Sequence, residues 1–202
     1  MIVNADIKSL EWVVAMYLSQ DPVGMKEIRE EMDAHSDNQR AFNLPSRLIA
    51  KVFLFRTIFA NLKFAANTFS KDPEFVPTST SRAFWQKVLD AFVGKYKGFA
   101  SWHVRLVQEG STTGKIVMCT GREYVFERDS RGEWPVTQMY NYPVQGLGAD
   151  ILSIIRVSFA KRFMTAKIDG VIVNTVHDSI VVDCHEKEVK KVEAILDRKS
   201  VV

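Results

Sequence analysis

The chain has 202 residues, of which 47% are hydrophobic and 25% are charged, and its formal net charge is +3. These values are ordinary for a soluble globular protein, and the sequence contains no internal repeat or low-complexity tract. The mild positive charge permits a nucleic-acid partner without indicating one, because affinity for phosphate depends on where cations cluster. The longest apolar region, 48–66, is interrupted by Lys51, Arg56 and Lys63, which argues against a membrane span.

Most of the N-terminal half is predicted to be helical. Residues 1–7 form a short β-rich run that reaches a carboxylate at Asp6, and Ser9 opens an apolar-periodic stretch. Pro45-Ser46 suits the start of the next long helix. The elements expected here are a strand over 1–7, a helix over 9–18, partial helix over 20–37, one helix over about 47–69, a loop over 71–81 and a helix over 82–96.

The C-terminal half mixes strands and helices. Four glycines at 94, 98, 110 and 114 punctuate a region that is expected to turn into strands, and Gly121-Arg122 is flanked as in a hairpin. The expected elements are strands over 115–120 and 123–127, a loop over 128–134, a block over 141–150 that precedes an apolar helix over 151–164, strands over 171–176 and 179–183, and a helix over 186–196. Strands at both ends with helices between them predict an α+β fold whose sheet is completed by distant parts of the chain.

Two cysteines and the start of the chain bear on the cell compartment. Cys119 and Cys184 are far apart and have no neighbouring Cys or His at zinc-ligand spacing, which is typical of reduced thiols in a cytosolic protein. Residues 1–5 run directly into Asp6 and Lys8, so no signal sequence is visible. We therefore expect a cytoplasmic protein that is not secreted.

Two carboxylates end β-rich runs. His177-Asp178 joins two β-branched segments, where tight hairpins usually need positive φ and favour Gly or Asn, so this tip departs from the local rule and such departures tend to be functional. The alternative is a longer, irregular turn with a surface Asp. Asp6 alone also fits an ordinary turn or helix-start aspartate. Together the two could hold a pair of Mg²⁺ ions, because magnesium prefers carboxylates and substrate phosphates and two such ions clamp an in-line phosphoryl transfer.

A third feature is a stripe with a period of four residues. Arg47, Lys51, Phe55 and Phe59 fall on one slowly drifting face of a helix. Phosphates would pair with the two cations, and a base or sugar would rest on the two rings, so the stripe suits a nucleotide. The alternative is an amphipathic helix with solvated cations and phenylalanines in the core.

Five blocks of the sequence combine these features. They are Asp6–Glu11, Asp33–Gln39, the stripe Arg47-Lys51-Phe55-Phe59, Asn141–Gly146 with Ala149-Asp150, and Val176–Asp178. In order and separation they resemble the family A (polymerase I-like) DNA polymerases, most of all their phage replicative branch. The first, third and fifth blocks resemble motifs A, B and C. The second resembles the block that leads into the fingers, and the fourth the block that contacts the primer–template minor groove.

The resemblance implies a polymerase palm, an antiparallel sheet with packed helices, plus mostly helical fingers. The palm would comprise 1–32 with motif A and 115–202 with the motif C hairpin at 171–183, and the fingers 33–114 with the motif B helix at about 46–66. The thumb and exonuclease, which precede motif A in the family, would be absent. There are three alternatives for the origin of such a chain: a split-gene subunit completed by a separate chain, a truncated gene, or a fragment of a longer protein. The expected location is the cytoplasm of a bacterial or phage-infected cell.

The resemblance also implies a role for each matching position. Asp6 and Asp178 would bind two Mg²⁺ ions with help from the Ile7 carbonyl, and Lys51 would protonate or stabilise the leaving pyrophosphate. Glu11 would lie under the sugar and exclude a ribose 2′-hydroxyl. The implied nucleotide-binding residues are Arg47, Lys51, His35, Phe55, Phe59 and Glu11. The implied DNA-binding residues are Asn141, Gln145, His177 and Arg122.

The implied reaction is template-directed DNA synthesis, in which a primer 3′-hydroxyl attacks a deoxynucleoside triphosphate and releases pyrophosphate. Ser179 stands where most family A DNA polymerases carry Glu, and His-Asp-Ser also occurs in single-subunit RNA polymerases, so an RNA polymerase-like nucleotidyltransferase is the second hypothesis. A non-catalytic nucleic-acid-binding fragment is the third. Phe59 and Ala60 replace the usual Tyr and Gly, and Thr137 stands where many relatives have Arg.

Overall fold

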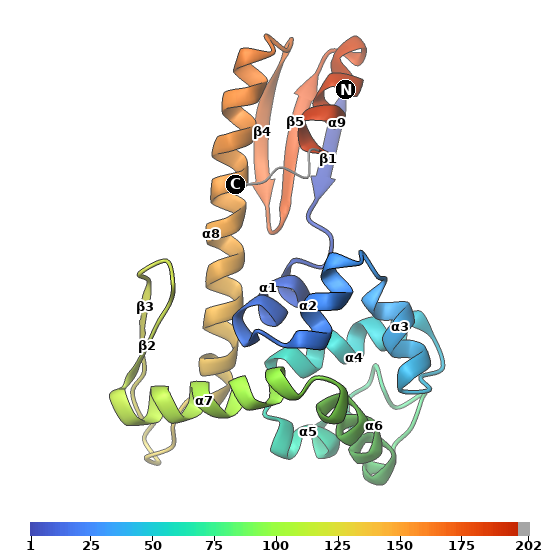
Figure 1. The fold of residues 1–202 in the computed structure, drawn as a ribbon, viewed down its shortest axis with the longest axis vertical. Helices are drawn as coiled ribbons and strands as arrows, with labels where there is room; N and C mark the ends of the chain where they lie inside the picture. The colour runs from blue at the N-terminus through green and yellow to red at the C-terminus, as the bar shows by residue number, and fades with distance from the viewer. Residues whose placement is uncertain (198–202) are drawn as a thin grey trace. The chain divides into compact units, whose positions relative to one another are not determined.

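The structure is a computed structural model that describes residues 1–197, and the chain divides into two compact units (Figure 1). We call Met1–Leu10 with the described residues from Gly146 onward the sheet unit, and Glu11–Gln145 the helical unit. In chain order the elements are β1 (Ile2–Asp6), α1 (Leu10–Ser19), α2 (Pro22–Arg29), α3 (Ala34–Ala41), α4 (Arg47–Phe59), α5 (Leu62–Phe69), α6 (Arg82–Lys95), α7 (Lys97–Thr113), β2 (Lys115–Val117), β3 (Glu123–Val125), α8 (Val136–Thr165), β4 (Gly170–Val176), β5 (Ser179–Cys184), one turn of 3₁₀-helix (Glu186–Glu188) and α9 (Val189–Leu196).

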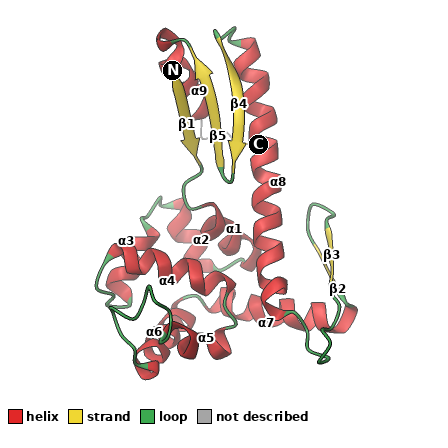
Figure 2. Cartoon of the chain, turned by 180° about the vertical axis from the view of Figure 1, so that it is seen from behind, coloured by secondary structure: helices red, strands yellow, loops and turns green. Residues whose placement is uncertain are grey.

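The sheet unit is built on a three-stranded antiparallel sheet of order β1-β5-β4 (Figure 2). The strands β4 and β5 are consecutive in the chain and form a hairpin. The strand β1 comes from the start of the chain and pairs with the other side of β5, from Ile2 opposite Asp183 to Asp6 opposite Ser179. The two strands of the hairpin lie within one residue of the predicted runs. The α+β prediction, with a sheet completed by distant parts of the chain, is confirmed.

One face of this sheet is buried beneath α8 and α9. Alternate residues of β5, Ile180, Val182 and Cys184, pack against Phe159 and Phe163 of α8 and against α9. Alternation with a period of two is what a half-covered antiparallel sheet requires, because successive side chains point to opposite faces. On the other face the side chains of Ile2, Val171 and Val173 are more than half exposed.

Aromatic rings form the core of the helical unit. Phe53 of α4 lies at its centre and contacts Phe69, Trp85 and Phe92 at centroid separations of 5.8–6.2 Å. The fully buried rings of this unit come from α4, α5, α6 and α7, from the loop between α5 and α6, and from the junction between α6 and α7: Phe53, Phe69, Phe75, Trp85, Phe92, Tyr96 and Phe99. Rings bury a large apolar area each, which lets short helices share one core.

Asp21 joins two helix starts of the helical unit and is itself fully buried. Its Oδ1 accepts from the backbone N–H groups of Val23 and Gly24 at the start of α2, each at 3.0 Å. Its Oδ2 accepts from Gly98 at 2.7 Å and Phe99 at 3.1 Å at the start of α7. A Cβ on Gly98 would lie 2.8 Å from the Asp21 Cα, so this close approach requires glycine.

A buried polar network fixes α3 in place. Lys95, at the end of α6, lies 2.9 Å from Glu27, 2.6 Å from Asp37 and 2.9 Å from the amide oxygen of Asn38. The Tyr96 hydroxyl reaches Glu27 and Asn38 at 2.8 Å each. Burial is the main cause that raises the pKa of Tyr96 far above its ordinary value, so the phenol stays protonated. The network therefore ties α3 to α2 and α6, although the side-chain amide nitrogen of Asn38 has no hydrogen-bond partner among the described residues.

Three expected elements differ from the structure. The helix predicted over 47–69 is two helices, because Ala60 is extended and Asn61 caps α5 by accepting from the Lys63 N–H at 3.2 Å. The block at 141–150 is not a separate segment before a helix. It lies inside α8, which continues through Pro143, where Val144 is fully buried and tertiary packing outweighs the poor helix propensity of proline.

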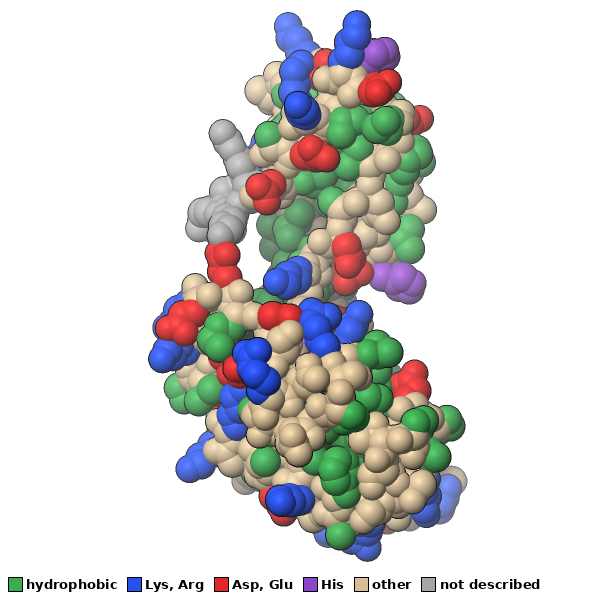
Figure 3. Space-filling model, turned by 90° about the vertical axis from the view of Figure 1, so that its right-hand side faces the viewer, with side chains coloured by type: hydrophobic (Ala, Val, Ile, Leu, Met, Phe, Trp, Pro, Cys, Tyr) green, Lys and Arg blue, Asp and Glu red, His purple; other side chains and the backbone are tan. Residues whose placement is uncertain are grey.

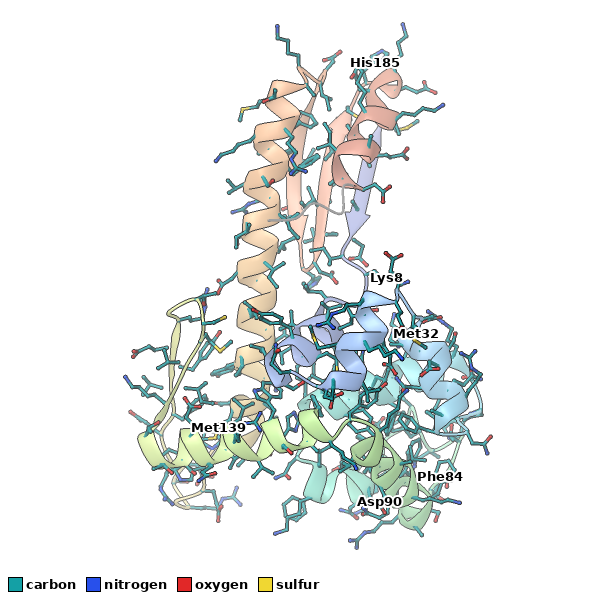
Figure 4. All side chains as sticks on the ribbon, in the orientation of Figure 1. Lys8, Met32, Phe84, Asp90, Met139 and His185 are labelled. Atoms are coloured by element: carbon teal, nitrogen blue, oxygen red, sulfur yellow. The ribbon has the colours of Figure 1, made fainter. Side chains whose placement is uncertain are left out.

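The third difference concerns residues 97–113. The glycines of this region suggested a transition to strands, but the structure has the helix α7 there. Gly98 lets Asp21 approach the backbone of α7. Gly110 lets the side chain of Met139, which is labelled in Figure 4, pack directly against the same helix. Gly114, with φ of +71°, then ends α7 in the left-handed conformation. The first two glycines serve close packing, and only the third ends a helix.

On the face drawn in Figure 3, neither basic nor acidic side chains form one dominant patch. Lys and Arg side chains alternate with Asp and Glu on the face seen in Figure 3, in keeping with 27 basic and 24 acidic residues. Cys119 is exposed, Cys184 is buried, and both are free thiols. Among the residues described, no helix has both the length and the apolar character that crossing a membrane requires.

Candidate active site

The pairing of β1 with β5 brings Asp6 and Asp178 to the same end of one sheet. Asp6 lies opposite Ser179, the residue after Asp178, and the Ile7 N–H donates to the Asp178 carbonyl at 3.0 Å. The two carboxylate-bearing residues are therefore on neighbouring strand ends, although they come from opposite ends of the chain. Asp6 is exposed at this position.

The tip of the β4–β5 hairpin is a two-residue turn. Val176 pairs with Ser179, so His177 and Asp178 are its central residues, and the longer irregular turn considered from the sequence is wrong. His177 has φ of +53°, a conformation that costs a non-glycine residue free energy and that often occurs at functional sites. The Ser179 hydroxyl donates to the Val176 carbonyl at 2.9 Å and closes the turn.

The donor groups at this sheet end suit one kind of metal site. Within residues 1–197, no three side chains of His, Cys, Asp or Glu gather as a ready-made metal cage. Two carboxylates and the Ile7 carbonyl instead match Mg²⁺, which binds proteins through one or two carboxylates and completes its shell with water and substrate phosphates. Zinc, which takes a closed set of nitrogen and sulfur ligands in structural sites, does not match these donors.

The helix α4 carries the predicted stripe of cations and rings. Ser46 caps the helix by accepting from the Ile49 N–H at 3.2 Å, and Arg47 is its first residue. Phe55 is 45% exposed and meets Phe59 edge to face at 5.3 Å. The aromatic residue of α4 that enters the core is Phe53, so the sequence alternative with Phe55 in the core is wrong.

A hollow of about 360 Å³ lies beside the end of α4. Its lining includes Phe55 and Phe59 of α4, Phe64 of α5, and Thr137 of α8. Thr137 therefore borders this hollow with a short, uncharged side chain. Arg56 forms its polar edge and pairs with Asp72 at 3.4 Å.

His35 and Arg47 are linked by a residue to which the sequence assigned no role. Asp33 caps α3, accepts from the His35 backbone N–H at 3.2 Å, and pairs with Arg47 at 2.8 Å. The signal available in the sequence was an Asp at a helix start within the second block, but its arginine partner is fourteen positions away and in another helix. Glu11 lies in the first turn of α1.

The predicted DNA-contact residues of the helical unit gather around one helix and one hairpin. Asn141 and Gln145 are one turn apart on α8 and therefore share a face. Tyr142, between them, packs against Tyr124 at 5.4 Å and against Phe126 at 5.9 Å. These rings belong to the β2–β3 hairpin, whose turn carries Arg122, and the carbonyl of Arg122 accepts from the Met118 N–H at 2.8 Å.

The fold comes first: the arrangement of helices and strands is similar to that of the palm and fingers of a polymerase domain. A solved structure with this fold is the POL domain of Pol1 from M. smegmatis in complex with DNA primer-template and dNTP, with a TM-score of 0.79 and 17% sequence identity. The similarity covers 96% of this chain and 35% of that chain. Palm and fingers as the fold class are thereby confirmed.

The sequence then identifies the family. A model of DNA polymerase family A matches residues 1–200, and the chain belongs to this family. Similar proteins include the DNA polymerase I of Aquifex aeolicus, 26% identical over 97% of this chain, and that of Treponema pallidum, 22% identical over 96%. The chain spans 34% and 20% of the length of these relatives. Both are bacterial DNA polymerases I, and they do not support the phage replicative branch.

Proposed function

We propose that this chain carries the catalytic centre for template-directed DNA synthesis, in which a primer 3′-hydroxyl attacks the α-phosphate of a deoxynucleoside triphosphate and pyrophosphate leaves. The observation that supports this most is the β1–β5 register, which puts Asp6 and Asp178 on adjacent strand ends. Two carboxylates so placed suit the metal chemistry of phosphoryl transfer. Membership of DNA polymerase family A supports the choice of DNA as template and product.

In this proposal Asp6, Asp178 and the Ile7 carbonyl hold two Mg²⁺ ions. The bound ions would lower the charge on the phosphates and the pKa of the attacking hydroxyl. The protein contributes a rigid frame, because Asp6 ends β1 and Asp178 lies in the turn between β4 and β5, and these strands form one hydrogen-bonded sheet over a packed core. His177 would touch the primer from the strained tip of the hairpin.

The helical unit would supply the nucleotide contacts. The residues that would hold the triphosphate are Arg47, Lys51 and His35. Lys51 would also protonate the leaving pyrophosphate or stabilise its negative charge. The exposed ring of Phe55 and its neighbour Phe59 offer apolar surface to the sugar and the nascent base pair. Glu11 blocks the space that a ribose 2′-hydroxyl needs.

Primer–template DNA would lie along the residues of the fourth block. Asn141 and Gln145, on one face of α8, would contact the minor groove, and Arg122 would contact primer or template from its hairpin. In this proposal the palm comprises residues 1–32 and 115–202, and the fingers comprise residues 33–114. A separate chain that supplies a thumb or exonuclease would be a further binding partner of the protein.

The RNA polymerase hypothesis rests on the serine at position 179. The structure of the β4–β5 turn gives a different explanation for this serine. Its side chain is largely buried and its hydroxyl bonds to the Val176 carbonyl, so it has a structural role in the hairpin. The proposal therefore remains DNA synthesis. It concerns family A as a whole and does not extend to the phage replicative branch, since the similar proteins named above are bacterial.

The test is primer extension on a short primer–template with Mg²⁺, comparing the wild type with Asp178→Ala and Asp183→Ala. Asp183 is a matched control because it lies on β5, the strand that follows Asp178, and its side chain is more than half exposed. We expect Asp178→Ala to lower extension by at least about a thousandfold, since metal-held charge stabilisation supplies several kcal/mol of the barrier reduction. The control should retain wild-type extension. Undiminished extension by Asp178→Ala would refute the assignment of the metal site.

The same assay separates the alternatives. Ribonucleotides and deoxynucleotides offered side by side distinguish RNA from DNA synthesis. A wild-type protein that binds primer–template but extends no primer with either substrate would favour the non-catalytic nucleic-acid-binding fragment.

A further inference from the structure

Both carboxylate oxygens of Asp33 accept hydrogen bonds, from His35 and Arg47 of the proposed triphosphate site and from Ser36. Its Oδ1 accepts from the His35 backbone N–H at 3.2 Å and from Arg47 Nη2 at 3.1 Å. Its Oδ2 accepts from the Ser36 hydroxyl at 2.7 Å and from Arg47 Nε at 2.8 Å. One carboxylate thus fixes the start of α3 and the guanidinium of α4 at the same time.

The way in which Arg47 is held leaves part of its guanidinium available. A guanidinium carries five N–H donors in one plane, and the pair with Asp33 uses one from Nε and one from Nη2. One donor of Nη1 and the second donor of Nη2 lie along another edge of the plane, which matches the spacing of two phosphate oxygens. Arg47 is about half exposed, so an anion can reach this edge while the ion pair with Asp33 remains intact.

Stability does not explain why an arginine stands at this position. Arg47 is the first residue of α4, at the positive end of the helix dipole, where a cation is disfavoured. The helix start already has its cap in Ser46. An ion pair with both side chains more than one-third exposed adds little to folding, because water and salt screen it.

The carboxylate of Asp33 belongs to an anchored element. The partly buried amine of Lys95 binds Asp37 at 2.6 Å and Asn38 at 2.9 Å, and both residues lie on α3. The hydrogen bonds from Arg47 hold the pKa of Asp33 well below its usual range, so the residue is charged at any physiological pH. A fixed, permanently charged group is suited to orienting a flexible arginine.

From this geometry we infer that Asp33 is a positioning residue for nucleotide binding: it orients the guanidinium of Arg47 so that the free edge faces the triphosphate. The inference rests on the proposed function, because Arg47 is assigned to the triphosphate there. An opposite role is conceivable on charge alone, since a carboxylate repels phosphate. The two roles predict changes of opposite sign when the charge of Asp33 is removed.

The test is to measure KM and kcat for a deoxynucleoside triphosphate in primer extension, and Kd by titration of the same triphosphate, with Asp33→Asn. Asparagine is as good a helix cap as aspartate, so the start of α3 should persist while the charged pair is lost. We expect KM and Kd to rise about tenfold with kcat nearly unchanged, because Arg47 would bind the ground state and transition state alike. The matched control is Glu74→Gln, which removes an acidic partner of Arg56 on the same helix and should leave KM unchanged.

A double-mutant cycle with Arg47→Lys shows whether Asp33 acts through Arg47. Lysine cannot form the two-point contact, so adding Asp33→Asn to Arg47→Lys should raise KM less than about twofold further. Full additivity, or an unchanged or lower KM in Asp33→Asn, would overturn the inference. Should Asp33→Asn prove unstable in thermal unfolding, Asp33→Ser, which also caps the helix, provides the same comparison. A wild type that neither binds triphosphate nor extends a primer would instead refute the proposed function.

Discussion

His103 should make the helical unit sensitive to mild acid. The ring is 2% exposed, stacks on Tyr140 at 4.1 Å between centroids, and lies 4.2 Å from Phe99. Neither ring nitrogen has a hydrogen-bond partner among the described residues. Burial therefore lowers the pKa of His103 from 6.5 to about 3, because the charged imidazolium would lose its hydration, and this effect outweighs the backbone of Ile58, which raises the pKa.

The sign follows from proton linkage. The pKa is lower in the folded state, so the unfolded state takes up the proton first, and stability is complete above pH 6.5 and falls as the pH drops below it. One such group costs about 1.4 kcal/mol at about pH 5.5 and about 2.7 kcal/mol at about pH 4.5. These losses are a considerable part of the stability of an ordinary domain.

The assay is urea unfolding followed by tryptophan fluorescence between about pH 7.5 and about pH 4.5. All four tryptophans of the chain, Trp12, Trp85, Trp102 and Trp134, belong to the helical unit, so the signal reports on that unit. His103→Phe keeps an aromatic ring beside Tyr140 and cannot take up a proton. The difference between wild type and variant removes the contribution of the other titrating groups.

We expect the free energy of unfolding of the wild type to fall by about 1.4 kcal/mol more than that of His103→Phe on going to about pH 5.5. A difference between the two proteins that stays constant with pH would refute the reasoning, since it would mean that His103 becomes protonated as readily in the folded as in the unfolded state.

Three further predictions follow from single contacts. Asp21→Ala leaves the starts of α2 and α7 without their common acceptor and should lower the free energy of unfolding by roughly 3 kcal/mol in urea, whereas a loss below about 1 kcal/mol would show that water replaces the carboxylate. His177→Gly removes the free-energy cost of a positive φ and should raise the free energy of unfolding by up to about 1 kcal/mol in thermal unfolding. A clear loss of stability would show that His177 is not strained in this turn. Glu11→Ala should increase ribonucleotide incorporation relative to deoxynucleotides in competition assays, and an unchanged ratio would exclude Glu11 as the sugar gate.

Local patterns were sufficient for part of the fold. The β4–β5 hairpin and its two-residue tip follow from β-branched runs on either side of His177-Asp178, because strand preference and turn length are read over a few neighbouring residues. The exposed Phe55 on α4 also agrees with the stripe of four-residue period. The roles of these residues in catalysis and binding remain predictions.

Other elements were misread because packing between helices decides them. Gly98 and Gly110 would weaken an isolated helix, yet both lie inside α7, where one admits the Asp21 carboxylate and the other Met139. Pro143 would interrupt an isolated helix, yet α8 continues through it. The gain from burying these segments exceeds the local cost, and that gain depends on neighbours that are distant in sequence.

The sequence by itself determined the kinds of side chain that carry the proposed chemistry and their order along the chain, since five short blocks hold them. Only the tertiary structure decided that β1 pairs with β5, so that Asp6 and Asp178 end on neighbouring strands, and that Asp33 meets Arg47. The physical reason is that strand register and contacts between helices are fixed by the burial of whole faces, which joins residues whose separation in the chain no local pattern records.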